Sequence, residues 1–340
     1  MNAACYVGER TLTVMRQEPR SPGRGEVAID VAYTGICGTD LHILHGAMDA
    51  RVKLPAVLGH EMSGTIGAVG DGVDGWSPGD RVTVMPLAWC GSCPACRAGH
   101  QHICHNLDFL GIDSPGSMQA SWTVSQDVLV ALPDSLSLAD GALAEPTAVA
   151  VHDVNRAGLR EGERALVVGG GPIGLLIASV ASARGAEVLV LELSEPRRAF
   201  ANELGLRSID PTAGDLEEVV ADWTDGAGAD VAFEVSGAVA GIETAIQSLA
   251  VRGRLVVVAI HSTPAPVNLF RVFWRELTLI GARVYERGDF EEAVSLLASG
   301  AVPAARMITR IDPLDEVAAA FAELESGRAM KMLIDCQAGA

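Results

Sequence analysis

One segment, residues 163–198, constrains the fold of this 340-residue chain more than any other. It begins with an apolar run at 165–168, short enough for a strand that is buried on both faces. Three spaced glycines follow, then a helical stretch, and then a second apolar run at 187–191. The segment therefore predicts a strand, a tight turn, a helix and a second parallel strand, the repeating unit of a doubly wound α/β sheet.

The spacing of the three glycines indicates a function for this turn. Gly169, Gly171 and Gly174 fit the pattern G-x-G-x-x-G, with Pro172 and Ile173 inside it. The first glycine permits the tight turn, the second lets a pyrophosphate approach the backbone, and the third lets the helix pack on the strand. Because the motif follows a predicted strand and opens a predicted helix, it predicts a dinucleotide-binding turn.

The end of the second strand indicates which dinucleotide binds. Glu192 lies eighteen residues after Gly174, where a carboxylate hydrogen-bonds the ribose hydroxyls and repels a 2′-phosphate. The position favours NAD over NADP. Arg197 and Arg198 keep NADP open as the alternative, because a nearby arginine can hold the 2′-phosphate. Arg197 is counted with the cofactor-binding residues.

The alternation of strands and helices continues after residue 198. Four more strands are predicted, at 207–209, 230–235, 254–260 and 277–283. With the first two they make six, the number in a full dinucleotide fold. Helices are predicted at 196–204, 215–223 and 239–250.

A different pattern occupies residues 89–104, WCGSCPACRAGHQHIC, which hold four of the seven cysteines. Four thiolates can surround one tetrahedral zinc and leave no open position, as in a structural site. Buried free thiols are the alternative. The metal interpretation predicts a structural zinc on the following residues: Cys90, Cys93, Cys96 and Cys104.

A second, open metal site is predicted upstream. Cys37, in GICGTDLH, and His60 and Glu61, in LPAVLGHEMSG, are candidate ligands in two short loops. Glu145, immediately before Pro146, is a further carboxylate. A cysteine, a histidine and one carboxylate would leave one position free for substrate.

Taken together, these motifs resemble the zinc-dependent medium-chain dehydrogenase/reductase superfamily of the alcohol dehydrogenase type, over essentially the whole chain. The resemblance implies that Cys37 and His60 bind a catalytic zinc and that Glu145 stands where the classical alcohol dehydrogenases have a second cysteine. Glu61 is the other carboxylate that can approach the metal, and the sequence does not decide between the two.

The resemblance also implies a proton relay. Thr39 and His42 follow Cys37 by two and five residues, and they would pass the proton of the substrate hydroxyl onward. The alternatives are a turn cap for Thr39 and a surface role for His42. Asp40, between them, is expected to brace the loop by hydrogen bonds.

The acidic residue at position 145 favours the sorbitol, butanediol and threonine dehydrogenase branches. The predicted activity is hydride transfer between a secondary alcohol, such as a vicinal diol, polyol or cyclitol, and NAD. Oxidation of an amino alcohol such as L-threonine is the runner-up. Tyr285 could hold a substrate hydroxyl or only pack. A non-catalytic zinc-bearing member of the superfamily is the alternative from a different class.

The domains follow from the order of these motifs. Residues 1–150 and 286–340 are predicted to form a β-rich, zinc-binding catalytic domain, GroES-like by resemblance, and residues 151–285 a Rossmann domain. In the tail, helices are predicted at 289–297 and 314–326 and a strand at 330–336. Cys5 and Cys336 are expected to be core residues.

Charge and composition exclude several classes of partner. The formal net charge is −18, and Lys53 and Lys331 are the two lysines. Because no basic stripe exists, nucleic acid and anionic membranes are excluded as expected partners. The N-terminus lacks the pattern of a signal peptide, which predicts a cytoplasmic location. Resemblance implies a homodimer or homotetramer.

Overall fold

The computed structural model describes residues 1–261 and 263–338, which form two compact units. Unit 1 comprises Met1–Pro146, Glu286–Ala298 and Ala304–Ala340, and unit 2 comprises Thr147–Tyr285 and Ser299–Pro303. The sequence-based division placed 147–150 and 299–303 in the other unit. The first difference arises because one helix, α4 (Ala144–Ala157), begins in unit 1 and continues through unit 2.

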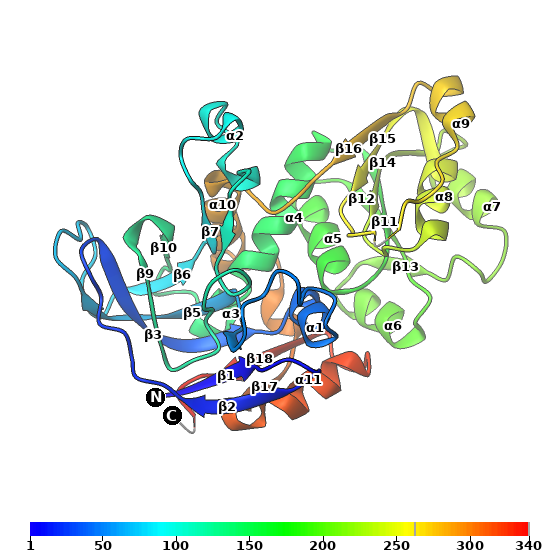
Figure 1. Ribbon diagram of the computed structural model, residues 1–340. Helices are drawn as coiled ribbons and strands as arrows, with labels where there is room; N and C mark the ends of the chain where they lie inside the picture. Colours follow the sequence, from blue (N-terminus) through cyan, green and yellow to red (C-terminus); the bar gives the residue numbers. More distant parts are fainter. Residues whose placement is uncertain (262, 339–340) are drawn as a thin grey trace. The chain divides into compact units, whose positions relative to one another are not determined.

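Unit 2 contains a parallel six-stranded sheet in the order β13-β12-β11-β14-β15-β16 (Figure 1). The strands are β11 (Arg164–Val168), β12 (Glu187–Leu191), β13 (Arg207–Ile209), β14 (Ala229–Glu234), β15 (Leu249–Val257) and β16 (Thr278–Gly281). This order is that of a doubly wound dinucleotide fold, so the predicted fold class and all six strands are confirmed.

The helices of unit 2 connect these strands. They are α5 (Pro172–Ala183), α6 (Glu195–Glu203), α7 (Leu216–Trp223), α8 (Val239–Ser248) and α9 (Leu269–Trp274). Helix α8 buries Ile242, Ala245 and Ile246, at the i, i+3, i+4 spacing of one helix face, in a core cluster with residues of β11, β12, β14 and β15. The core of this face therefore lies between α8 and the sheet.

Two elements of unit 2 differ from the prediction. The predicted helix at 239–250 ends at Ser248, because β15 begins directly at Leu249. Helix α9 was not predicted. Its sequence LFRVFW is apolar nearly all round, so it shows no helical alternation, and Asn268 begins it by accepting the backbone N–H of Arg271.

Unit 1 is rich in strands. Its largest sheet runs β10-β6-β5-β3-β18-β17, with β9 also paired to β3, and two smaller sheets are β2-β1-β4 and β7-β8 (Figure 1). The strands are β1 (Asn2–Tyr6), β2 (Leu12–Arg16), β3 (Glu26–Gly35), β4 (Ala56–Val57), β5 (Glu61–Val69), β6 (Arg81–Val84), β7 (Leu87–Ala88), β8 (Asp108–Phe109), β9 (Ser121–Ser125), β10 (Leu129–Ala131), β17 (Ile308–Pro313) and β18 (Lys331–Asp335). Strand β18 returns the tail to β3 in antiparallel register.

The α-helices of unit 1 are short apart from those of the tail. They are α1 (Gly38–Leu44), α2 (Pro94–Arg97), α3 (Leu138–Gly141), α10 (Arg287–Ala298) and α11 (Val317–Glu325). The predicted helix at 314–326 is divided into a 3-10 turn, Leu314–Glu316, and α11. Helix α1 replaces a predicted loop. Asp40 caps it by accepting the backbone N–H of Cys37 at 2.9 Å.

No helix in the described part of the chain is long and apolar enough to span a membrane. Cys5 and Cys336 are fully buried, as expected of core residues.

Candidate active site

Three candidate metal ligands meet where β3, α1 and β5 approach one another. Cys37 is the N-cap of α1, His60 precedes β5, and Glu61 begins β5, with ligand atoms within 4.8 Å of one another. The local backbone requires glycine at two neighbouring positions. At Gly59, φ is +96°, and a side chain at Gly35, which pairs with Glu61, would overlap the Glu61 carboxylate.

The polar atoms of this cluster suit a cation. His60 and Glu61 are buried, and Glu61 Oε1 has no hydrogen-bond partner. Burial alone would lower the pKa of His60, but the negative side chains of Asp40 and Cys37 hold that pKa well above its usual range. A sulfur, an imidazole nitrogen and a carboxylate oxygen are the donors that zinc accepts, so the residues fit this metal.

Asp40 lies next to the imidazole ring of His60. Asp40 is fully buried; its Oδ2 accepts the Cys37 N–H, and its Oδ1 lies 3.7 Å from His60 Nδ1. A proton on Nδ1 facing this carboxylate would leave Nε2 as the metal-binding nitrogen. The bracing role expected for Asp40 is therefore observed, together with a contact to His60 that sequence reasoning missed.

Glu145 lies apart from the three ligands in the described structure. It is buried in the first turn of α4, and its charge contributes to raising the pKa of His60. Its carboxylate is nevertheless outside the group whose ligand atoms are mutually within 4.8 Å. The geometry thus brings Glu61, rather than Glu145, together with Cys37 and His60.

Lys331 is a site residue that sequence reasoning missed. It lies buried on β18, where its Nζ forms an ion pair with Glu61 Oε2 and donates to the carbonyl of Ile36 at 3.1 Å. Burial opposes its charge, but Glu61 and Cys37 raise the pKa of Lys331. A lysine inside an apolar strand, in a chain with two lysines, was the signal that could have found it.

The two predicted relay residues lie on one helix. Thr39 is in the first turn of α1 and half-buried, and His42 is one turn further and exposed. Residues three apart are neighbours on a helix surface, so the pair leads from a half-buried hydroxyl to an exposed imidazole.

The four clustered cysteines lie close together. Their sulfur atoms lie within 4.8 Å of one another, at distances such as 3.5 Å between Cys93 and Cys96 and between Cys90 and Cys104. Backbone N–H groups lower the pKa of Cys93, and, with the Asn106 amide, they lower that of Cys90 to about 5. Four sulfur atoms in this geometry fit a closed tetrahedral zinc.

The glycine turn joins β11 to α5. Gly169 has φ +112°, and Gly171 is the N-cap of α5. A side chain on Gly174 would overlap the Gly169 carbonyl, so the third glycine is needed for close packing of helix on strand. Glu192 Oε2 accepts the Gly170 N–H and Oε1 accepts the Ser194 N–H, both at 2.8 Å, which fixes the carboxylate beside the turn.

The two arginines near Glu192 have different environments. Arg198 donates to the carbonyls of Glu192 and Leu193 and pairs with Asp210 at 3.3 Å, so its charge is already engaged. Arg197 lies beside the turn, with Nη1 3.9 Å from the position of a side chain on Gly171.

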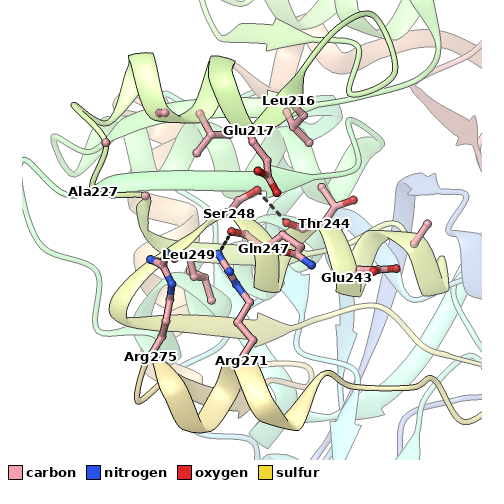
Figure 2. Close-up of a pocket in the computed structure, with 15 residues that line it drawn as sticks. Leu216, Glu217, Ala227, Glu243, Thr244, Gln247, Ser248, Leu249, Arg271 and Arg275 are labelled. Carbon is pink, nitrogen blue, oxygen red and sulfur yellow. Dashed lines mark hydrogen bonds between the residues drawn. The ribbon is translucent and has the colours of Figure 1, made fainter.

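A hollow of about 500 Å³ lies elsewhere in unit 2, between α7, α8 and α9 (Figure 2). Arg271 reaches across it to the carbonyls of Ile246 and Gln247 at the end of α8. The residues that line it lie on these helices, in the turn before β14 and at the first residue of β15, at the amino edge of the sheet. The glycine turn is at the carboxyl edge, so this hollow is not the dinucleotide site.

Two other residues have no exposed reactive group. Tyr285 is fully buried, which favours the packing alternative, and His152 lies buried on α4, the helix that also carries Glu145.

Comparison with known proteins identifies the family. The family described as "Alcohol dehydrogenase GroES-like domain" matches residues 23–134, and "Zinc-binding dehydrogenase" matches residues 172–299. A 2-dehydro-3-deoxy-L-galactonate 5-dehydrogenase from Pseudoalteromonas atlantica is 50% identical over 99% of both chains. The chain belongs to the zinc-binding alcohol dehydrogenase family. Members of this family are oxidoreductases that use a nicotinamide cofactor, and the GroES-like and Rossmann assignments are confirmed.

Other relatives of this dehydrogenase are polyol and diol enzymes. A sorbitol dehydrogenase from Halalkalibacterium halodurans is 34% identical over 96% of both chains. The structure of 2R,3R-butanediol dehydrogenase from Bacillus subtilis is 32% identical and covers 98% of this chain and 99% of its own, with a TM-score of 0.90. A zinc-binding dehydrogenase from Sinorhizobium meliloti, bound to NADP, is 30% identical over 98% of both chains, with a TM-score of 0.93. The predicted branch, polyol and diol dehydrogenases, is confirmed.

Proposed function

We propose that this dehydrogenase oxidises a secondary hydroxyl of an acyclic sugar acid or polyol, using NAD⁺ and a zinc held by Cys37, His60 and Glu61. The meeting of these three ligand atoms within 4.8 Å carries the proposal. Three protein ligands leave a fourth position for the substrate oxygen. Glu145, buried nearby, is the alternative carboxylate when Glu61 pairs with Lys331.

Different residues of the chain would carry out different parts of the reaction. When bound, zinc would lower the pKa of the alcohol, and NAD⁺ would accept the hydride. Thr39 Oγ1 takes the proton of the hydroxyl, and His42, one turn along α1 and exposed, passes it to solvent. Asp40 orients His60 and caps α1, so it holds both the metal ligands and the relay in place.

The cofactor proposal, NAD rather than NADP, rests on Glu192. Its carboxylate is fixed beside the glycine turn by two backbone N–H groups, where it would meet the ribose hydroxyls and repel a 2′-phosphate. The engagement of Arg198 with two carbonyls and Asp210 supports this choice, because that arginine is not left to bind a phosphate. Pro172 and Ile173, in the first turn of α5, complete the pyrophosphate-binding turn with the three glycines.

Two further features belong to the proposal. Cys90, Cys93, Cys96 and Cys104 would hold a second, structural zinc, which gives two zinc ions per chain. Four reduced thiols require a reducing compartment, which supports a cytoplasmic location. The exposed apolar helix α9 supports a homodimer or homotetramer.

The test is the rate of NADH formation by purified, zinc-loaded protein. The substrates are 2-dehydro-3-deoxy-L-galactonate, galactitol, sorbitol, butanediol stereoisomers and L-threonine, each with NAD⁺ or NADP⁺. We expect the highest kcat/KM with the sugar acid or a polyol and with NAD⁺. Turnover of threonine alone would contradict the substrate class, and preference for NADP⁺ would contradict the role of Glu192.

A further inference from the structure

A second carboxylate lies at the carboxyl edge of the unit 2 sheet. Glu234 is the last residue of β14, fully buried, and paired in register with Val168, which immediately precedes the glycine turn. The strand order reverses between β11 and β14, since β12 and β13 lie on one side and β15 and β16 on the other. In open α/β sheets, the ligand binds outside the carboxyl ends of the strands at such a point.

The Glu234 carboxylate connects two segments that leave this edge. Its Oε1 accepts the backbone N–H groups of Ser236 and Gly237 at 2.9 and 3.0 Å, and the Ser236 hydroxyl at 2.5 Å. Its Oε2 lies 2.9 Å from Nε2 of His261, which belongs to the segment that follows β15. One buried carboxylate thus holds the turn after β14 and the segment after β15 together.

The main chain of Glu234 holds the same segment at its other end. The backbone N–H groups of Val258 and Ala259 donate to the Glu234 carbonyl at 3.0 and 3.1 Å. Between these contacts and His261, Ile260 projects its apolar side chain into solvent, with 83% of its surface exposed. Residues 258–261 are therefore attached at both ends and present an apolar side chain between them.

The proposed position of the adenosine half of the cofactor indicates which half would contact residues 258–261. Glu192, at the end of β12, is placed for the adenosine ribose, and the glycine turn after β11 is placed for the pyrophosphate. The remainder of the dinucleotide extends across the switch point, over the carboxyl ends of β14 and β15. This remainder is the nicotinamide ribose and ring.

We propose that the Glu234–His261 pair is a latch that positions residues 258–261 against the nicotinamide half of the cofactor. This inference rests on the proposed use of NAD. The two are positioning residues, because they act by fixing the segment that carries Ile260. A segment held in its binding conformation before the cofactor arrives loses less conformational entropy on binding.

The strength of the hydrogen bond between Glu234 and His261 sets the expected loss of NADH affinity. A hydrogen bond to a buried carboxylate is stronger than a neutral one, and removing the donor leaves one carboxylate oxygen without its partner. The cost of that loss would be shared between folding of unit 2 and binding of the cofactor. We expect loss of the His261 donor to weaken NADH binding by about tenfold to a hundredfold.

The test compares two ligands on three variants of the full-length, zinc-loaded protein. NADH and ADP, which lacks both the nicotinamide ribose and the ring, are titrated by isothermal calorimetry. His261→Leu removes the donor, and His261→Gln keeps an N–H donor at similar reach. His45→Leu is the matched control, because His45 pairs with Glu325 at 2.6 Å in unit 1. Thermal unfolding is recorded for each variant.

The expected pattern is selective. His261→Leu binds NADH about tenfold or more weakly but binds ADP like the parent protein, His261→Gln recovers most of the NADH affinity, and His45→Leu changes neither. Unchanged NADH affinity in His261→Leu, or an equal loss for both ligands, would overturn the latch and leave the proposed function intact. A parent protein that binds no NADH would overturn both.

Discussion

Thr39 is the first residue of the proposed proton relay. It lies in the first turn of α1, two residues after the candidate ligand Cys37, and is half-buried. Thr39→Val keeps the shape but removes the hydroxyl, so kcat/KM should fall by about 10²- to 10⁴-fold with zinc content unchanged. Thr39→Ser should keep most of the activity. Equal activity in the valine variant would remove Thr39 from the mechanism.

Asp40 has a different proposed role, since it contacts the two candidate ligands Cys37 and His60. Asp40→Asn keeps an acceptor for the Cys37 N–H but loses the charge that faces His60 Nδ1 at 3.7 Å. The affinity for zinc should fall by about 10- to 100-fold, measured by competition with a chelator. Asp134→Asn, at a fully exposed carboxylate, is the control and should retain zinc like the parent protein.

Sequence patterns predicted the candidate metal ligands but not the residues that surround them. Cys37, His60 and Glu61 belong to short motifs whose residue types are required by the metal itself. Lys331 comes from a strand 270 residues after Glu61, and its pairing depends on the antiparallel register of β18 with β3, which no local pattern records. For the same reason, the sequence could not decide between Glu61 and Glu145.

In the glycine turn, Gly174 is needed for packing, whereas Gly171 is proposed to bind the pyrophosphate. A side chain on Gly174 would overlap the Gly169 carbonyl, whereas one on Gly171 would find its nearest neighbour, Arg197, at 3.9 Å. Gly174→Ala should therefore lower the free energy of unfolding by about 1–3 kcal/mol. Gly171→Ala should leave it within about 0.5 kcal/mol but weaken NADH binding, because its methyl group obstructs the pyrophosphate. Urea unfolding and NADH titration measure the two effects, and a reversed order would contradict this division.

The cysteine lobe is an element that its metal would hold together. Cys93 accepts backbone N–H groups of Cys96 and His105, and it lies within reach of the other three sulfur atoms. Cys93→Ser should lower the zinc content by one ion per chain and the free energy of unfolding by at least about 2 kcal/mol.

A matched cysteine controls for the loss of any thiol. Cys336→Ala changes a fully buried cysteine of the core, where burial raises the pKa to about 12, and should leave the zinc content unchanged. Full zinc content in Cys93→Ser would refute the structural zinc.

The elements that the sequence predicted well are those with a strong local signal. The central strands β11 and β14 of unit 2 are buried on both faces, so their apolar runs stand out, and β12 and β13 have the predicted bounds. Helices α1 and α9 were missed because their signals conflict with the usual patterns. The cap of α1 is a cysteine, and α9 places apolar residues on its exposed face.

In the whole molecule, the exposed apolar face of α9 is expected to pack against another protein chain. Leu269, Phe270, Phe273 and Trp274 are each about 70% exposed, and Phe270 stacks on Trp274 at a centroid distance of 5.7 Å. Strand β16, which follows α9, is the last strand of its sheet and leaves one edge open. An open edge beside an apolar patch is complementary to a copy of itself across a two-fold axis, so a second copy of this chain is the expected occupant.

The oligomeric state tests this assignment. Phe273→Glu combined with Trp274→Glu would bury two carboxylates in such an interface, so the variant should sediment as a monomer where the parent protein sediments as a dimer or tetramer. Ile311→Glu, at a partly exposed apolar residue of unit 1, is the control and should not dissociate the assembly. A double variant with the sedimentation coefficient of the parent would place the interface elsewhere. Retained NADH binding in the monomer would show that unit 2 binds its cofactor without help from a second copy.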